Sequence, residues 1–140
     1  MELAERLEIA RSVEPAMAAS RDWMDEHCRL PAAGVEALHR SGIMRAAVPA
    51  ELGGPELDPM AQIALVEEFS RVDGALGWCA MIAGASSYVC GFLGPEAAAR
   101  WFTRTDACVA GQLSPTGQAE RVDGGHVVPG HFRFGSGINH

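Results

Sequence analysis

Lysine is absent from this sequence of 140 residues, and the eleven basic residues are arginines that stand singly along the chain. Against 18 acidic residues they leave a net charge of −7. An acidic chain repels the phosphate backbone of nucleic acids, and the basic clusters that hold anionic membrane surfaces are missing. The charge pattern therefore predicts a protein that binds neither nucleic acid nor membrane.

Cysteine pairs with the spacing of a redox or metal motif are also absent. The four cysteines include no C-x-x-C pair, and the apolar content of 48% is enough for a core without disulfide support. Cys79 and Cys90 are eleven residues apart, about three helical turns, so we expect them on one face as small core residues. The N-terminus lacks the basic start and apolar run of a signal peptide. We therefore predict reduced thiols and a cytoplasmic location.

Familiar cofactor motifs are missing too. Gly53-Gly54 is not followed by the Lys-Ser/Thr of a phosphate loop, and no G-x-G-x-x-G follows a strand. His126, His131 and His140 are spaced too irregularly for a helical or short-loop metal site. Their imidazoles titrate near neutral pH and could serve as acids or bases, but exposed strand histidines are the simpler interpretation. The sequence predicts no metal site.

Residues 74–93, GALGWCAMIAGASSYVCGFL, carry no charge over about the length that spans a bilayer. This segment is either a membrane helix or a helix buried on all sides of a soluble bundle. Gly, Ala and Ser dominate it, which makes its transfer into lipid weak and favours the buried helix. We accordingly expect Trp78, Ile82 and Val89 to be buried by neighbouring helices.

Apolar residues at three- and four-residue spacings predict about five helices before residue 105. Residues 2–27 read as helix with a kink at Pro15, and a second helix begins at Pro31 and ends at Gly42. Prolines and a Gly-Gly pair predict an ordered loop over residues 49–59. Asp58-Pro59 then starts a helix in which Ile63, Val66, Phe69 and Val72 repeat every three residues. Asp73 caps the uncharged helix, and Gly94-Pro95 begins a short one.

After residue 104 the pattern changes to short apolar runs between turn residues. ACVAGQLS at 107–114 reads as a strand, and 118–122 and 126–134 flank Asp123-Gly124-Gly125 as a hairpin. Two or three strands with open edges do not make a stable sheet. The predicted architecture is mainly α: an all-helical domain over 1–104 and the beginning of an antiparallel β domain over 105–140, cut within that domain.

Three stretches carry a resemblance to the acyl-CoA dehydrogenase superfamily, in the same order as in that family. They are RLPAAGVEALHRSGIMRAAVPAELGGPELDP (29–59), IALVEEFSRVDGALGWCAM (63–81) and VDGGHVVPGHFRFGSGINH (122–140). True dehydrogenases usually carry a Thr-Glu-Pro-like turn where this chain reads LSPTGQAER. The ending HFRFGSG resembles the two-component flavin-dependent monooxygenase (hydroxylase) branch, although Phe132 stands where that branch commonly has Trp.

The resemblance implies a flavin site formed by two loops. Ser136 would lie beside the reactive edge of the flavin ring, and Gly137 would let the backbone approach it; the alternative is an ordinary Ser-Gly turn. Ser114 and Thr116, with Gln112 in reach of the same place, would meet the flavin from the other loop, or else flank a proline turn.

Trp78 is the third part of the implied site, because aromatic residues on this helix can line the substrate pocket in the family. The alternative is a core tryptophan. No catalytic side chain is identified in the chain. A C-terminal helical bundle, which completes the flavin site and the tetramer in the family, lies outside it.

The resemblance implies the oxygenase component of a two-component monooxygenase. It would take reduced flavin, FAD or FMN, from a separate flavin reductase and hydroxylate an aromatic or similar apolar small molecule with O₂. The full-length protein would be a homotetramer. Two alternatives stay open: an acyl-CoA dehydrogenase, and a non-catalytic remnant or partner subunit that binds no flavin by itself.

Overall fold

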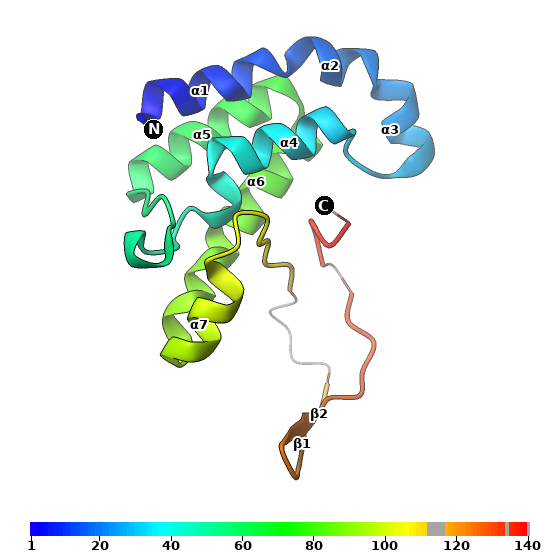
Figure 1. Ribbon diagram of the computed structural model, residues 1–140. Coiled ribbons are helices and arrows are strands. Elements are labelled where there is room, and N and C mark those ends of the chain that lie inside the picture. Colours follow the sequence, from blue (N-terminus) through cyan, green and yellow to red (C-terminus); the bar gives the residue numbers. More distant parts are fainter. Residues whose placement is uncertain (112–116, 134, 140) are drawn as a thin grey trace.

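The structure, a computed structural model, describes residues 1–111, 117–133 and 135–139. Helices form most of this part of the chain, and a short antiparallel pair of strands follows them (Figure 1). The predicted fold class is confirmed. The α-helices are α1 (Leu3–Ser12), α2 (Glu14–Ala19), α3 (Arg21–His27), α4 (Ala32–Ser41), α5 (Pro59–Val72), α6 (Gly74–Ser86) and α7 (Pro95–Phe102). The 3₁₀ helices are η1 (Ile43–Arg45), η2 (Ala50–Leu52) and η3 (Ser87–Phe92), and the strands are β1 (Glu120–Val122) and β2 (Gly125–Val127).

The predicted helix boundaries hold where a local hydrogen bond or backbone angle decides them. The Asp58 carboxylate accepts hydrogen bonds from two backbone N–H groups in the first turn of α5, and Asp73 does the same for α6. These caps satisfy donors that have no partner within the helix. Gly42 ends α4 with a φ of +80°, an angle that glycine adopts without strain.

The first predicted helix, residues 2–27, is divided into α1, α2 and α3. Pro15 lies in the first turn of α2, as its missing N–H requires. A second break, at Ser20, was not predicted. The Ser20 hydroxyl donates to the carbonyl of Ala16 at 2.8 Å, and such a bond back to the preceding turn often bends a helix.

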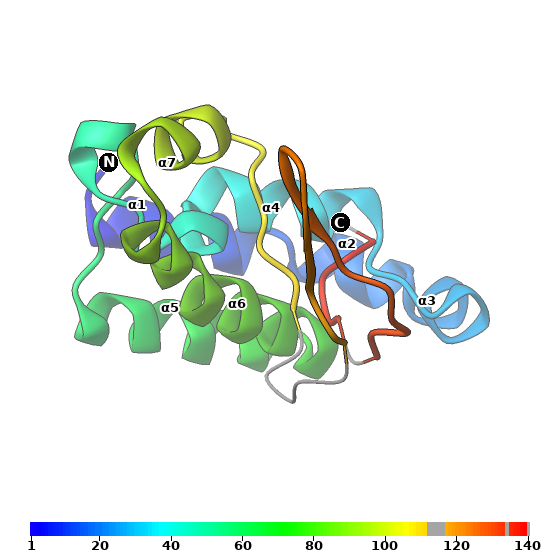
Figure 2. The same ribbon diagram turned by 90° about the horizontal axis from the view of Figure 1, so that it is seen from below.

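The core is centred on α5 and α6, which lie side by side (Figure 2) and are covered by α1, α4 and η1. Their backbones come together at Gly77, where an added Cβ would meet the Ser70 Oγ at only 2.0 Å. Gly77 therefore permits the close packing of the two helices. The largest fully buried side chains are Met17, Leu38, Ile43, Met44, Leu65, Phe69 and Leu76.

The expectation that α6 is buried on all sides is wrong. Trp78 is 54% exposed, and Ile82 and Val89 are half-buried. One face of α6, which includes Leu76, packs on α5 and η1, while the opposite face is open to solvent. The uncharged composition hid this two-sidedness, because Ala and Gly occur on both faces. Residues 74–92 have the length and composition of a membrane span, a test that core helices also pass.

The β region is smaller than predicted. Residues 107–111, the described part of the first expected strand, form no strand, and β1 and β2 cover only 120–122 and 125–127 of the longer runs expected. The Asp123-Gly124-Gly125 turn does join them in antiparallel register, with Arg121 opposite His126. Every residue of the two strands is exposed. A pair of strands without further partners has little to bury, so the ladder stays short.

The buried side chain of Arg45 connects the loop before α5 to the end of α7 by hydrogen bonds. The Arg45 guanidinium donates to the carbonyls of Leu52 at 3.2 Å and Gly53 at 3.3 Å, and also to that of Phe102. Its side chain is only 7% exposed. The planar fork of arginine can serve several carbonyls at once, which a single ammonium group cannot do with the same geometry.

We predict that Arg45→Lys lowers the free energy of unfolding by about 2 kcal/mol, because buried carbonyls lose charged donors. Denaturant titration followed by circular dichroism measures this change. Arg40→Lys is the matched control: its guanidinium is 63% exposed and pairs with Glu36 on the same helix. An exposed pair of this kind contributes below about 0.5 kcal/mol. Equal losses in both variants would contradict the role given to Arg45.

We also predict that α6 is held by protein and not by lipid, because one of its faces is already covered by α5 and η1. After lysis without detergent and ultracentrifugation, the protein should remain in the supernatant. Recovery in the membrane fraction, with release only by detergent, would contradict this packing.

Candidate functional site

Trp78 and Ser136, two of the residues predicted for the site, are in direct contact. The Trp78 Nε1–H donates to the Ser136 Oγ, with the two atoms 3.0 Å apart. The residues are 58 positions apart in sequence. After α7 the chain runs out to the β1–β2 hairpin and then returns, which brings its C-terminal end back beside the helices (Figure 1). The structure therefore joins a helix residue and a turn residue into one site.

The sequence Gly-Ser-Gly-Ile builds the turn that presents Ser136. The Ile138 N–H donates to the Gly135 carbonyl at 3.1 Å, which closes a four-residue turn with Ser136 at its first corner. Gly137, at the second corner, has a φ of +87°. This combination fits a type II turn, in which that corner favours glycine. The segment is a turn, and the turn directs the serine hydroxyl to α6.

The chemistry of the two side chains decides which of them donates this hydrogen bond and which accepts it. An indole N–H can only donate, so the Ser136 oxygen is the acceptor. The serine hydroxyl keeps its own O–H and a second lone pair. Ser136 is half-buried and the Trp78 ring is half exposed. Both groups are therefore accessible to a ligand while they are held by each other.

Two thiols lie next to this contact. Cys79 follows Trp78 on α6 and is buried, and the Sγ of Cys108 would lie 3.8 Å from a Cβ added at Gly137. Burial raises the pKa of the Cys79 thiol, with smaller contributions from Cys108 and Asp73, and burial also raises the pKa of Cys108. Both thiols are therefore protonated at neutral pH and are poor nucleophiles. Both residues contribute small, uncharged side chains next to the contact.

Cys90 is also buried, as predicted, but it does not share a cluster with Cys79. Cys79 belongs to the main core, whereas Cys90 packs with Val48 and Phe102. The reason is that α6 ends at Ser86 and the chain continues as η3, whose tighter winding changes the direction of later side chains.

The remaining predicted flavin residues, Gln112, Ser114 and Thr116, lie outside the described residues. Gly117, just after them, faces the Phe132 ring, which would meet an added Cβ at 2.9 Å. Gly130 faces the same ring at the same distance. The two glycines thus leave room for an aromatic side chain in the β region, at the position where the resembling branch commonly has Trp.

Of the histidines singled out in the sequence, His126 and His131 are exposed, as expected, and His140 lies outside the described residues. Within the part of the chain that the structure describes, no group of three metal-ligating side chains comes together. No titratable group is hydrogen-bonded to Ser136 or Trp78 among these residues. The candidate site therefore offers neutral hydrogen-bonding groups and an aromatic surface.

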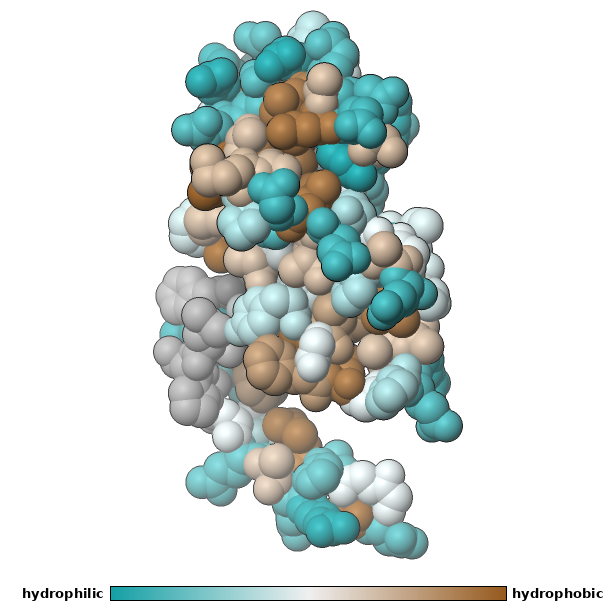
Figure 3. All heavy atoms as spheres, turned by 90° about the vertical axis from the view of Figure 1, so that its left-hand side faces the viewer, coloured by the Kyte–Doolittle hydropathy of each residue, from teal (hydrophilic) through white to brown (hydrophobic). Residues whose placement is uncertain are grey.

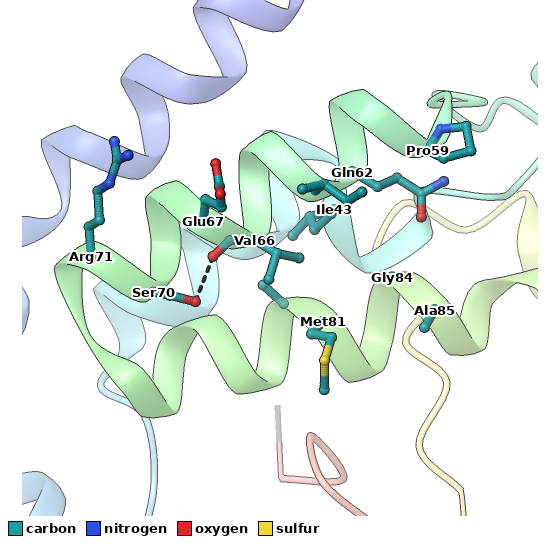
Figure 4. A pocket seen from close by; sticks show the side chains of 12 residues that line it. Ile43, Pro59, Gln62, Val66, Glu67, Ser70, Arg71, Met81, Gly84 and Ala85 are labelled. Carbon is teal, nitrogen blue, oxygen red and sulfur yellow. Dashed lines mark hydrogen bonds between the residues drawn. The ribbon is translucent and has the colours of Figure 1, made fainter.

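An apolar groove lies between α5 and α6 and was missed by the sequence analysis. Its volume is about 680 Å³, and Ile43, Val66 and Met81 are among the residues that line it (Figure 4). Ile63, which also lines it, is 52% exposed, whereas Phe69, in the same three-residue repeat, is fully buried. Three residues turn a helix through about 300°, so a strict repeat of three drifts around the helix by about 60° per step. This rotation is the feature of the sequence from which the exposure of Ile63 could have been predicted.

On the face drawn in Figure 3, apolar residues form several patches that polar side chains separate.

Comparisons with known proteins agree with this architecture. Residues 4–105 match the family model described as the N-terminal domain of acyl-CoA dehydrogenase. The chain is 36% identical over 104 residues to indole-3-acetate monooxygenase of Acinetobacter baumannii, an alignment that covers 74% of the chain and 26% of the relative. It is 29% identical over 114 residues to the oxygenase component of an FADH2-dependent resorcinol hydroxylase from a Rhizobium species, which covers 81% and 28%.

A solved structure, the 3-HSA hydroxylase from Rhodococcus sp. RHA1, superposes with a TM-score of 0.85 at 25% identity. The superposition covers 100% of this chain and 36% of that one. The chain thus spans 26% to 36% of the length of these proteins. The resemblance drawn from the three sequence stretches is confirmed, and since the family match extends over most of the residues, the chain belongs to the acyl-CoA dehydrogenase family, of which it carries the N-terminal domain.

Proposed function

We propose that this chain forms part of the oxygenase component of a two-component flavin-dependent monooxygenase. The protein would take reduced flavin, FAD or FMN, from a separate reductase and hydroxylate an aromatic or similar apolar small molecule with O₂. The observation that carries the proposal is the Trp78–Ser136 contact, which places an aromatic surface beside an accessible hydroxyl. The relatives named as monooxygenase and hydroxylase support the same activity.

The chemistry of Ser136 and Gly137 fits a flavin ring. Reduced flavin presents an N–H beside a carbonyl at one edge, and the serine hydroxyl has one lone pair and one O–H left to meet such a pair. Gly137 has no side chain, so the backbone of the turn can come close to a flat ligand. When bound, reduced flavin would activate O₂ and supply the oxygen atom, and the residues of this chain would orient the ring and keep water away.

Trp78 would contribute the other wall. Its ring is 54% exposed on α6, and an indole face stacks well with aromatic ligands. A flavin edge held at Ser136 and a substrate on Trp78 would thus be neighbours. The proposal places Gln112, Ser114 and Thr116 on the flavin as well, on the strength of the resemblance alone.

We also propose a division at residue 104, with an N-terminal helical domain over 1–104 and the beginning of a β domain over 105–140. Among the described residues, the last α-helix ends at Phe102 and the first strand begins at Glu120, which supports the division. A homotetramer and a cytoplasmic location belong to the same proposal.

A second candidate is an acyl-CoA dehydrogenase, which the description of the family model favours. The two activities differ in what reduces the flavin. A dehydrogenase bleaches its oxidised flavin when an acyl-CoA thioester is added without O₂, whereas the proposed oxygenase requires a reductase. A third candidate, a partner subunit without flavin, would give colourless purified protein.

The activity test uses Ser136→Ala in the intact protein, with a reductase supplying reduced flavin. We expect several-fold more hydrogen peroxide per molecule of hydroxylated product, because a bond worth about 0.5–1.5 kcal/mol is lost at the reacting edge. Flavin affinity should fall only modestly, since many other contacts hold the ring. The measurement is the ratio of peroxide to product.

Ser12→Ala is the control for this test, because Ser12 is exposed at the end of α1 and its hydroxyl bonds the Ile9 carbonyl. It should leave the ratio unchanged. If Ser136→Ala behaves like Ser12→Ala, Ser136 is only a turn residue, and the monooxygenase proposal loses its local support.

A further inference from the structure

We propose that Trp78 is a positioning residue that sets the direction of the Ser136 hydroxyl, an inference that rests on the proposed flavin site. The indole N–H occupies one lone pair of the serine oxygen. The remaining lone pair and the O–H are thereby turned away from α6 and towards the side on which a ligand can approach. Trp78 thus acts on the flavin edge through Ser136, in addition to offering its ring to a substrate.

The two partners differ in how firmly the backbone holds them. Asp73 caps the first turn of α6 through two backbone N–H groups, and Gly77, the neighbour of Trp78, is pressed against Ser70 of α5. The base of Trp78 therefore lies beside a close contact between two packed helices. Ser136, by contrast, lies in a turn at the end of a long excursion through the β1–β2 hairpin.

A rigid element that donates a directed bond can hold a group on a less constrained one. A free serine hydroxyl rotates among three staggered positions, and its proton follows whichever acceptor is near. The bond from Trp78 selects one of these arrangements before a ligand arrives. Such preorganisation strengthens hydrogen bonds to the ligand, because less rotational freedom is lost on binding.

The donor and the aromatic surface can be separated by mutation. Trp78→Phe keeps an apolar ring on α6 and removes the N–H. A role limited to substrate packing predicts little effect of this change when no substrate is present, whereas a positioning role predicts that Trp78→Phe has the same effect as Ser136→Ala.

The hydrogen bond itself is tested by NMR on the intact protein labelled with ¹⁵N-tryptophan. The Trp78 indole signal is assigned as the one that Trp78→Phe removes. Ser136→Ala should shift this signal and speed its exchange with solvent, while Ser136→Thr, which retains a hydroxyl, should leave it close to its original position. An indole signal that does not respond to Ser136→Ala overturns the inference, whatever the activity of the protein.

The effect on the flavin is tested without substrate. Intact protein loaded with reduced FAD is mixed with oxygenated buffer, and the rate of hydrogen peroxide release is measured. We expect Trp78→Phe and Ser136→Ala each to raise this rate about two- to tenfold, the range that one hydrogen bond supplies. The double variant should be no faster than Ser136→Ala, because both changes disable one hydroxyl.

Trp23→Phe is the matched control, since Trp23 is 41% exposed and stacks on His27 of α3, far along the chain from the site. It should release peroxide at the original rate. If Trp78→Phe matches this control, or if its effect adds to that of Ser136→Ala, Trp78 does not act through the serine and the positioning role is overturned.

These outcomes are separable from failure of the proposed function. Suppose that Ser136→Ala shifts the indole signal but Trp78→Phe hydroxylates substrate normally. The monooxygenase proposal then stands, and only the positioning role is overturned. Protein that neither binds reduced FAD nor consumes O₂ with it overturns both, and the NMR comparison still decides whether the bond exists.

Discussion

The contact between Gly77 and Ser70 is the constraint on which the rest of the structure depends. At this point α5 and α6 approach so closely that no side chain fits between them. Because Gly77 faces α5, the next residue along the helix, about 100° further round, points away from the core. Trp78 is placed outward by this geometry, and the C-terminal turn meets it there.

The groups described at the candidate site are neutral. Among the described residues, those that meet near Trp78 supply a serine hydroxyl and two thiols whose pKa values are raised by burial, beside the indole itself. Such groups orient a ligand and exclude water, but they do not exchange protons readily near neutral pH. This character suits an enzyme whose bound cofactor performs the oxygen chemistry and whose protein part controls position.

The buried arginines stabilise the fold and are not part of the candidate site. Arg45 holds three carbonyls of the loop and of α7, and Arg6 donates to the Ser41 carbonyl at the end of α4. Burial lowers the pKa of Arg6, yet an arginine stays charged at any physiological pH. Both side chains satisfy carbonyls that the ends of helices leave without partners. Within the loop over residues 49–59, the carbonyls of Leu52 and Gly53 accept hydrogen bonds from Arg45.

The sequence by itself determined the features that depend on neighbouring residues. Asp58 and Asp73 begin their helices, Gly42 ends one, and Gly137 shapes its turn, because each acts through a local hydrogen bond or its own φ angle. The family could also be identified from three stretches whose order is visible along the chain. Ser136 and Trp78 could be singled out only through that resemblance, because the residues alone favoured an ordinary turn and a core tryptophan.

Only the tertiary structure decided which faces are covered and which distant residues meet. The exposure of Trp78, the outward position of Ile63 and the shortness of the strands depend on what packs against them. Composition hid the open face of α6, since alanine and glycine suit a buried surface and an exposed one alike. The bond from Trp78 to Ser136 joins residues 58 positions apart. No local preference encodes such a meeting, because it requires the packed helices and the returning chain to be in place together.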